Sequence, residues 1–386
     1  MRHSLSDTKI FLRGAFLFSF PLILLFGFPF AVFWYSGEFT SLAAVIDSQQ
    51  HDPHPALFGR AYSNPDKEYK LRLTLVRSPE VVALGTSRVM QFRESFFKSG
   101  TRFTNAGGAI VVADDFKKFL DELPAGHEPK VIIVGLDPRF FNPAWDTPFV
   151  GTYHNPSFWT LHEFFTYGWR QFYSDMFHGK MKWDHLLPRA GEGASIGINA
   201  RMNHDGFRSD GSYYYGKFLG DPLFPERTRE EIKSFVAGLL PGSRAVEYGR
   251  EVSGMRLDSL DRFLQSAAKR HIAVVGFLPP HSRLLYDKIQ SFPPEFRKSF
   301  TDLPISLRGL FAAQGFSFYD FSDVRSIGSS DDELIDVAHG SEKMYARVII
   351  EMAQRDSGVA AFVDAASLQG AVNHASSSFE ILPSVW

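Results

Sequence analysis

Three residue types in this sequence could together carry out nucleophilic chemistry: a serine, a histidine and an aspartate. Ser87 follows the apolar run "EVVALG" (80–85), and Asp336 and His339 stand three residues apart in "DVAH". Acyl transfer needs a hydroxyl nucleophile, an imidazole that takes its proton and a carboxylate that fixes the imidazole tautomer. An Asp-x-x-His pair can place the carboxylate beside one imidazole nitrogen and leave the other facing the serine. We therefore predict Ser87 as nucleophile, His339 as general base and Asp336 as its orienting acid.

Acyl transfer also needs N–H donors at the position where an oxyanion forms. A serine at the start of a helix offers its own N–H, because the first amides of a helix have no partner within it. The segment "NAGG" (105–108) follows a second strand-like run. Glycine lets the backbone approach a substrate closely. We therefore predict Asn105 and Gly107 or Gly108, together with the amide of Ser87, around the oxyanion.

Three basic side chains are further candidates for binding substrate. Arg88 directly follows Ser87, and "PPHSR" (279–283) puts His281 and Arg283 after a later strand. Arg88 could steady an acyl or phosphate group or pair with a carboxylate. His281 and Arg283 could bind an anionic group or a glycan at the rim, although packing or capping roles are equally compatible with the sequence.

Each of these signals is weak by itself. A Gly-x-Ser after an apolar run is common in structural turns, Asp336 could merely cap a helix, and His339 could be a surface imidazole. The prediction depends on their joint order along the chain.

The elements that must position these residues alternate between strand-like and helix-like patterns. Short apolar runs of the kind found in strands buried on both faces alternate with amphipathic segments. We predict strands at 80–85, 102–108, 130–138, 272–280 and 316–321, and helices at 113–124, 256–271, 305–315 and 340–355. Such alternation indicates an α/β fold with a parallel five-stranded sheet covered by helices on both faces. Functional residues in these folds gather at the carboxyl ends of the strands.

The N-terminus carries the clearest physical signal. Residues 14–35 hold no charge, and at ~1.5 Å per residue they can cross a ~30 Å hydrocarbon layer as a helix. Arg2, Lys9 and Arg13 precede this span, and so the positive-inside rule predicts a cytoplasmic N-terminus and an extracytoplasmic main domain. The alternative is a cleaved signal peptide, but the apolar stretch is long and no clear cleavage site follows it.

Composition excludes several other classes of site and partner. The 386 residues contain no cysteine, which rules out disulfides, cysteine-based zinc sites and a thiol nucleophile. A formal net charge of −2 provides no field that would attract nucleic acid. Neither a phosphate-binding glycine loop nor an HExxH zinc motif is present, and we expect no metal and no cofactor.

The same patterns predict the domain boundaries. We expect a cytoplasmic N-terminus (1–13), a transmembrane helix (14–35), a linker (36–68), one α/β domain (69–355) with an insertion at about 139–250, and a mobile or peripheral C-terminal tail (356–386). The insertion contains the aromatic run 153–179, for which we prefer buried packing to a lid or a location near the membrane surface.

The segments "GTSRVMQF", "NAGG", "VIIVGLDPRFF" and "DVAH", in this order, resemble the blocks of SGNH (GDSL-type) hydrolases. They are most similar to the membrane-anchored branch, which includes the D-alanine transfer protein of teichoic acids and the polysaccharide O-acetylation proteins. The resemblance covers roughly residues 65–145 and 270–350. It implies a three-layer α/β/α, flavodoxin-like fold, a Ser87 nucleophile with Asp336 and His339, and no cofactor. It also implies cell-envelope glycans or glycolipids as substrates and a multi-span membrane-bound O-acyltransferase as partner.

The sequence departs from this family at the third block. Asp137 stands where typical members have an asparagine that donates to the oxyanion, and a carboxylate donates a hydrogen bond only when it is protonated. Transfer to another acceptor and weak hydrolysis both remain open.

Two functions of different classes follow from these observations. The first is a membrane-tethered, extracytoplasmic acyl esterase or O-acyltransferase. The second is a catalytically inactive module of the same fold that binds a glycan or scaffolds a membrane complex. A cytosolic esterase fits less well because it would not explain the uncharged, apolar segment 14–35.

Overall fold

The computed structural model describes residues 2–145, 161–187, 194–219, 221–243 and 246–383. The chain divides into two compact units. The first comprises residues 1–65 and 154–206, and the second comprises residues 66–153 and 207–385.

The second unit is built on a parallel five-stranded sheet. Its strands are β2 (Val81–Gly85), β3 (Phe103–Gly107), β4 (Val131–Gly135), β8 (Ala273–Leu278) and β9 (Ser317–Asp320). They lie in the order β3-β2-β4-β8-β9, and every neighbouring pair is parallel. The predicted α/β class and parallel five-stranded sheet are therefore confirmed.

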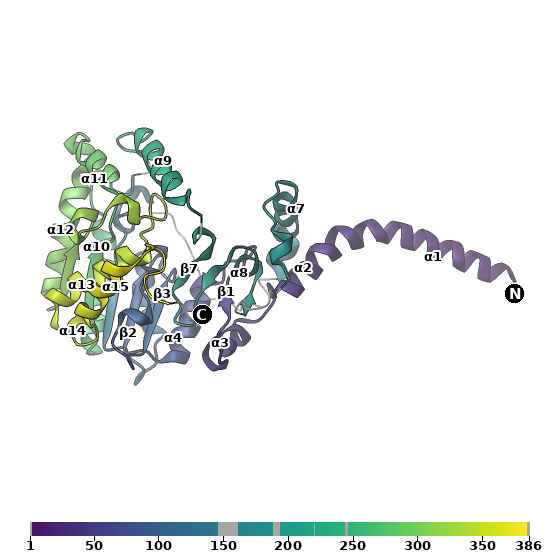
Figure 1. The fold of residues 1–386 in the computed structure, drawn as a ribbon, viewed down its shortest axis with the longest axis horizontal. Helices are drawn as coiled ribbons and strands as arrows, with labels where there is room; N and C mark the ends of the chain where they lie inside the picture. Colours follow the sequence, from purple (N-terminus) through teal and green to yellow (C-terminus); the bar gives the residue numbers. More distant parts are fainter. Residues whose placement is uncertain (1, 146–160, 188–193, 220, 244–245, 384–386) are drawn as a thin grey trace. The chain divides into compact units, whose positions relative to one another are not determined.

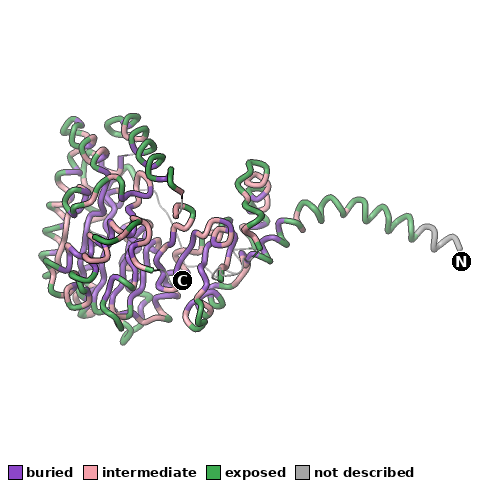
Figure 2. The backbone as a smooth tube through the Cα atoms, in the orientation of Figure 1, coloured by how far each residue is buried: buried purple, intermediate pink, exposed green. Residues whose placement is uncertain are grey.

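Helices cover both faces of this sheet because alternate strand residues point to opposite sides. Val82, Ile132 and Val274 belong to one buried apolar cluster, and Val81 and Ile133 belong to the other. The helices of this unit are α4 (Asp66–Arg77), α5 (Asp114–Asp121), α9 (Phe224–Ala237), α10 (Gly254–Lys269), α11 (Arg283–Gln290), α12 (Pro294–Ala313), α13 (Glu342–Arg355), α14 (Ser357–Ala360) and α15 (Ala365–His374). Figure 1 shows α10 to α15 gathered around the sheet. Strands β2, β3 and β4 are buried along their whole length (Figure 2).

The predicted C-terminal tail is an ordered part of this unit. Residues 357–374 carry α14 and α15, whose side chains Val359, Leu368 and Val372 are buried in the cluster that contains α13. The sequence shows little periodicity there because small residues form most of the two short helices. The last residues of the predicted tail, 384–386, lie outside the described residues.

The first unit begins with a long apolar helix. It is built from α1 (Arg2–Leu22), a π-helical turn η1 (Ile23–Gly27) and α2 (Phe28–Ser36). Its segment Thr8–Ser36 has 29 residues and contains an 18-residue window with a mean hydropathy of 2.3, which by length and composition is enough to cross a membrane. Most of the residues of α1 whose burial is described are exposed (Figure 2).

The rest of this unit differs from the prediction of a linker at 36–68. Helix α3 (Leu42–His51) and strand β1 (Leu57–Phe58) lie in that range, and Leu42, Val45 and Phe58 are buried. Among the described residues, the other elements are η6 (Phe164–Gly168), α7 (Trp169–Phe177), η7 (Trp183–His185), β5 (Ser195–Ile196), α8 (Ile198–Asn203) and the start of β6 (Asp205–Phe207). Strand β1 pairs in parallel with β5, which comes about 140 residues later in the chain.

The predicted insertion at 139–250 is therefore divided between the units, with 154–206 in the first and 207–250 in the second. Turn-forming residues suggested a linker because they are local signals, whereas the partners that bury this segment are distant in sequence. Residues 146–160, which include the start of the predicted aromatic run, lie outside the described residues.

Candidate active site

Ser87 lies two residues beyond the carboxyl end of β2, in a turn that its neighbours hold in place. Thr86 precedes the short 3-10 helix η2 (Ser87–Val89), and its Oγ1 accepts a hydrogen bond of 3.2 Å from the N–H of Arg88. Thr86 also donates through Oγ1 to Asp137 Oδ2, at 2.7 Å. Ser87 itself is half-buried, so its hydroxyl can meet a substrate.

His339 and Asp336 lie in a tight loop just before α13. An antiparallel bridge between Leu334 and Gly340 closes this loop, and the N–H of Ile335 donates to the carbonyl of His339 at 2.8 Å. Within the loop, Asp336 Oδ1 accepts the N–H groups of Ala338 and His339 at 2.7 and 2.8 Å. These bonds fix the orientation of the carboxylate that contacts the imidazole ring.

The structure brings Ser87, His339 and Asp336 into one hydrogen-bonded chain. Ser87 Oγ lies 2.8 Å from His339 Nε2, across 252 residues of sequence. The other ring nitrogen, Nδ1, lies 2.8 Å from Asp336 Oδ2 and 2.9 Å from Oδ1. Burial alone would raise the pKa of Asp336, but the hydrogen bonds and charge of His339 and the two N–H donors outweigh burial and lower it. Asp336 is therefore ionised at neutral pH, and it can hold the Nδ1–H tautomer that leaves Nε2 free to take a proton from Ser87.

The backbone donors differ from the prediction. The N–H of Gly107 donates to the side chain Oδ1 of Asn105 at 2.8 Å, and the N–H of Gly108 donates to the carbonyl of Gly85 at 2.9 Å. Both predicted glycine donors are therefore committed within the protein. In the part of the chain that the structure describes, no residue accepts a hydrogen bond from the Ser87 N–H, and so this amide can point to an oxyanion.

Asn105 also has a different role from the one predicted. Its side chain is fully buried, and Nδ2 donates to the carbonyls of Val89 and Phe92, each at 2.8 Å. It therefore holds the turn that carries Ser87 and does not contact substrate. A Cβ atom at Gly107 would lie 2.9 Å from side-chain atoms of both Val89 and Met90, which explains the glycine beside this turn.

Asp137, two residues beyond the end of β4, is buried and contacts the turn that carries Ser87 through Thr86. Its Oδ2 accepts the Thr86 hydroxyl and lies 3.6 Å from Arg139 Nε, while Oδ1 has no hydrogen-bond partner among the described residues. Asp137 therefore accepts a hydrogen bond at the position where the family has a donor, and the bond that it accepts positions Thr86.

Arg88 is buried and paired, not exposed to a substrate. Its Nη1 lies 2.9 Å from Glu247 Oε2. Burial would lower the pKa of Arg88, but Glu247 and Asp137 raise it, and so the guanidinium stays charged. Burial raises the pKa of Glu247 against the opposing charge of Arg88. Glu247 was not predicted, because it lies in the predicted insertion (139–250) and carries no local motif.

His281 and Arg283 do not form the predicted rim. His281 is 2 % exposed, its ring packs edge-on against Tyr248 with centroids 5.8 Å apart, and neither ring nitrogen has a hydrogen-bond partner among the described residues. Burial and the charge of Arg88 hold the pKa of His281 well below 6.5, and so this ring is neutral. Arg283 is exposed at the start of α11, where its N–H donates to Asp331 Oδ1 at 2.6 Å.

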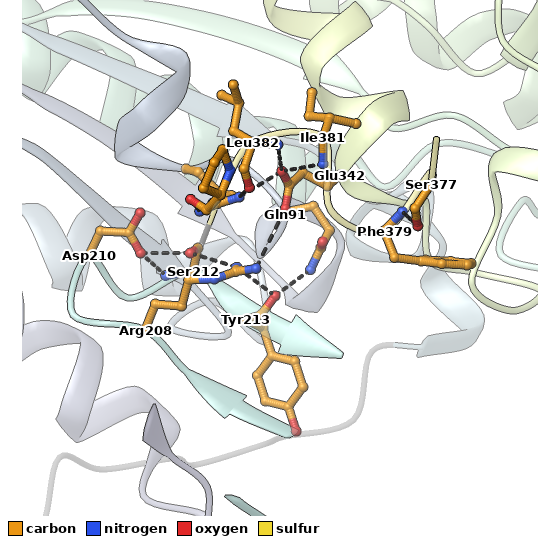
Figure 3. A network of polar contacts seen from close by, with 12 residues as sticks. Gln91, Arg208, Asp210, Ser212, Tyr213, Glu342, Ser377, Phe379, Ile381 and Leu382 are labelled. Carbon is orange, nitrogen blue, oxygen red and sulfur yellow. Dashed lines mark hydrogen bonds and ion pairs between the residues drawn. The ribbon is translucent and has the colours of Figure 1, made fainter. Parts of the chain in front are cut away.

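A buried polar network braces the segments that follow Ser87 and His339 (Figure 3). Arg93, six residues after Ser87, pairs with Glu342, three residues after His339, at 2.7 Å. Glu342 Oε1 also accepts the N–H of Ile381 at 3.0 Å, and Arg93 donates to the carbonyl of Leu382 at 2.9 Å. The network therefore ties the segments that follow Ser87 and His339 to the C-terminal segment.

Histidine, aspartate and glutamate form no group of three or more suited to a metal ion among the described residues. In comparisons with protein-family models, curated proteins and solved structures, nothing matches this chain.

Proposed function

We propose that this protein is a membrane-tethered, extracytoplasmic serine esterase or O-acyltransferase of the SGNH type, acting on cell-envelope polysaccharide or its precursors. The single observation that carries the proposal is the chain of contacts from Ser87 Oγ through His339 to Asp336, at 2.8 Å for each step. This arrangement of nucleophile, base and orienting acid is the one that Ser-His-Asp enzymes use for acyl transfer.

The arrangement supports a two-step reaction. In the first step Ser87 Oγ attacks the acyl carbonyl, His339 Nε2 takes the hydroxyl proton, and a tetrahedral oxyanion forms near the Ser87 N–H. Collapse of this intermediate breaks the ester bond, and His339 gives its proton to the leaving alcohol, which leaves an acyl-serine. In the second step a water molecule or an acceptor hydroxyl loses its proton to His339 and attacks the acyl-serine. The bond between Ser87 Oγ and the acyl carbon then breaks, which releases the free acid or the new ester, and His339 returns the proton to Ser87 Oγ.

The sheet order supports assignment of the SGNH fold. In chain order the strands of the second unit lie as 2-1-3-4-5, which is the flavodoxin-like order, with helices on both faces. Ser87 follows the first of these strands, at the point where the connections turn to opposite sides of the sheet. The resemblance of the sequence blocks to SGNH hydrolases supports a three-layer α/β/α reading of this unit.

The apolar helix supports the proposed membrane anchoring. Segment Thr8–Ser36 is long enough to cross a bilayer, and Lys9 and Arg13 near its start favour a cytoplasmic N-terminus. The resemblance to the membrane-anchored branch adds envelope glycans or glycolipids as substrates. It also adds a membrane-bound O-acyltransferase that would supply acyl groups across the bilayer.

One observation favours a second candidate, an inactive SGNH-type module that binds a glycan or scaffolds such a complex. The N–H groups of Gly107 and Gly108 are both bonded within the protein, and Asp137 offers acceptors where a donor is expected. A site with one free amide stabilises an oxyanion less, since removal of a single donor costs about 10²- to 10³-fold in rate in other serine enzymes.

A fluorophosphonate probe separates the two candidates. It reacts only with a serine whose hydroxyl is activated, and the resulting phosphonyl-serine can be located by mass spectrometry. The full chain in detergent would be treated with the probe and with a small acetyl ester, alongside Ser87→Ala and His339→Ala. Ser291→Ala is the matched control, because Ser291 is an exposed serine at the end of α11.

An enzyme is expected to be labelled at Ser87 and to release acetate, with both activities lost in Ser87→Ala and His339→Ala and kept in Ser291→Ala. If wild type remains unlabelled and inert toward the ester and toward acyl acceptors while it is folded, the catalytic proposal is wrong and the binding module is favoured.

A further inference from the structure

An aromatic helix packs directly against the candidate membrane span within the first unit. Residues 161–177 are helical throughout, through the π-helical turn η6 and α7. Phe164 and Phe172 of this helix are buried, and they contact Phe30 and Phe28 of the span with ring centroids 5.7 and 5.6 Å apart.

The contacts reach deep into the span. Trp169 packs on Phe26 with centroids 4.9 Å apart, and the hydroxyl of Tyr173 donates to the carbonyl of Leu24 at 2.9 Å. Leu24 lies in the π-helical turn η1, and its carbonyl also accepts the N–H of Phe28. The hydrogen bond from Tyr173 fixes the height of α7 along the span.

The length of the span then limits where the bilayer can lie. From Thr8 to Leu24 a helix rises only about 24 Å, and the hydrocarbon core is about 30 Å thick. Residues 2–7 contain Arg2, His3 and Asp7 and cannot extend the apolar segment. If Thr8–Ser36 spans a bilayer, the Tyr173–Leu24 contact must therefore lie inside the leaflet nearer Ser36 or at its surface.

The exposed surface of the same helix suits that location. Leu161, Phe165, Trp169, Tyr173 and Phe177 recur at every fourth position and form one ridge. Along this ridge Leu161, Phe165 and Phe177 are 43 %, 60 % and 79 % exposed. Beside it runs a polar ridge, also at every fourth position, made of His162, Thr166, Arg170, Ser174 and His178.

This amphipathic pattern is typical of helices that lie in the membrane interface, where aromatic rings are favoured. Exposed Arg170, Lys180 and Lys182 on and after the helix can meet anionic headgroups. We infer that residues 161–177 form an interfacial membrane helix, whose aromatic ridge inserts into the lipid leaflet nearer Ser36 beside the membrane span. This inference rests on the membrane anchoring proposed above and does not depend on catalysis.

The absence of cysteine from the chain makes a direct test possible, because a single introduced cysteine is the only site for a spin label. The full chain would be reconstituted in nanodiscs of phosphatidylcholine and phosphatidylglycerol without any other protein. Labels at Phe165→Cys and Phe177→Cys report the aromatic ridge. Thr166→Cys and His178→Cys, one residue further along, are the matched controls on the polar ridge. The measurement is the ratio of collisions with oxygen, which partitions into lipid, to collisions with a water-soluble nickel complex.

Two reference positions calibrate this ratio. Phe20→Cys lies in the middle of the span, and Ser291→Cys lies on the exposed surface of the second unit. We expect the ratios at 165 and 177 to lie near the value at 20, and those at 166 and 178 to lie closer to the value at 291.

Each alternative result overturns the inference. If 165 and 177 give the aqueous value while 20 gives the membrane value, the span is real but the helix does not insert. If the aromatic ridge instead binds another protein, its labels would also give the aqueous value in nanodiscs that contain no other protein. If position 20 itself is aqueous, the proposed anchoring fails, and the interfacial helix fails with it.

Discussion

Replacement of Asp336 by asparagine exchanges one carboxylate oxygen for an amide nitrogen, and it tests whether Asp336 orients His339 for catalysis. The two backbone N–H groups of the loop, from Ala338 and His339, both donate to Oδ1 of Asp336. An asparagine can keep these bonds through its single oxygen. Its amide nitrogen then replaces Oδ2, which lies 2.8 Å from His339 Nδ1.

This exchange reverses the tautomer of the imidazole. The asparagine amide can only donate at that position, and its N–H groups oppose a proton on Nδ1. The tautomer with the ring proton on Nε2 is therefore favoured, even though the retained Oδ1 lies 2.9 Å from Nδ1. A protonated Nε2, 2.8 Å from Ser87 Oγ, cannot take the serine proton. In another serine enzyme the same type of replacement lowers the rate about 10⁴-fold. We therefore expect a loss of about 10³- to 10⁴-fold, or about 4–5.5 kcal/mol of transition-state stabilisation.

The assay is the second-order rate constant for fluorophosphonate labelling at pH 7.5, compared among wild type, Asp336→Asn and Ser87→Ala. Asp336→Ala serves as the contrast, because it also removes the acceptor of the two loop N–H groups and should lower the melting temperature more than Asp336→Asn does. If Asp336→Asn is labelled within threefold of the wild-type rate while Ser87→Ala is not labelled, Asp336 does not control the imidazole and the reasoning is refuted.

Two further predictions concern buried groups around the site. Asn105→Ala removes the donor to the carbonyls of Val89 and Phe92 and leaves these buried groups without partners. We therefore expect the free energy of unfolding, measured by urea titration, to fall by about 3–5 kcal/mol. We also expect fluorophosphonate labelling of Ser87 to be slower. His281 is neutral in the folded protein because burial and Arg88 lower its pKa, but in the unfolded chain it takes up a proton near pH 6.5. Above that pH the ring is neutral in both states and does not lower the free energy of unfolding. Below pH 6.5 the unfolded chain takes up a proton that the folded protein does not, and the free energy of unfolding falls by about 1.4 kcal/mol per pH unit. His281→Phe should make the stability of the protein fall less steeply between pH 7.5 and pH 5.

Each of these predictions has a control. Thr104 precedes Asn105 on β3 and is equally buried, but its hydroxyl has no hydrogen-bond partner among the described residues. Thr104→Val should therefore leave stability unchanged or raised, and an equal loss in both variants would contradict the role given to Asn105. For His281, wild type and His281→Phe with parallel stability curves between pH 7.5 and pH 5 would show that the ring does not stay neutral when folded.

The sheet could be predicted because its signals are local. Continuous apolar runs such as Val81–Gly85 and Val131–Gly135 indicate strands buried on both faces, and the amphipathic segments between them indicate helical crossovers. These patterns located all five strands of the sheet. They also located Ser87, Asp336 and His339, because such residues follow strand ends or precede a helix, and their spacing is visible in the sequence.

The region around residues 36–68 was not predictable in the same way. Leu42 and Phe58 are buried by a unit that also contains residues 154–206, and nothing local indicates that these distant segments fold together. Turn-forming residues were therefore interpreted as a linker. The short helices of the C-terminal segment were missed because few of their residues are strongly apolar.

The sequence by itself determined the types of group at the strand ends and their order along the chain. Only the tertiary structure decided which of these groups are available. Gly107 and Gly108 donate within the protein, Arg88 faces Glu247, and His281 is buried beside Tyr248. A residue's type sets the hydrogen bonds that it can make, but the partners that use them come from distant segments, and these meet only when the sheet and its helices pack.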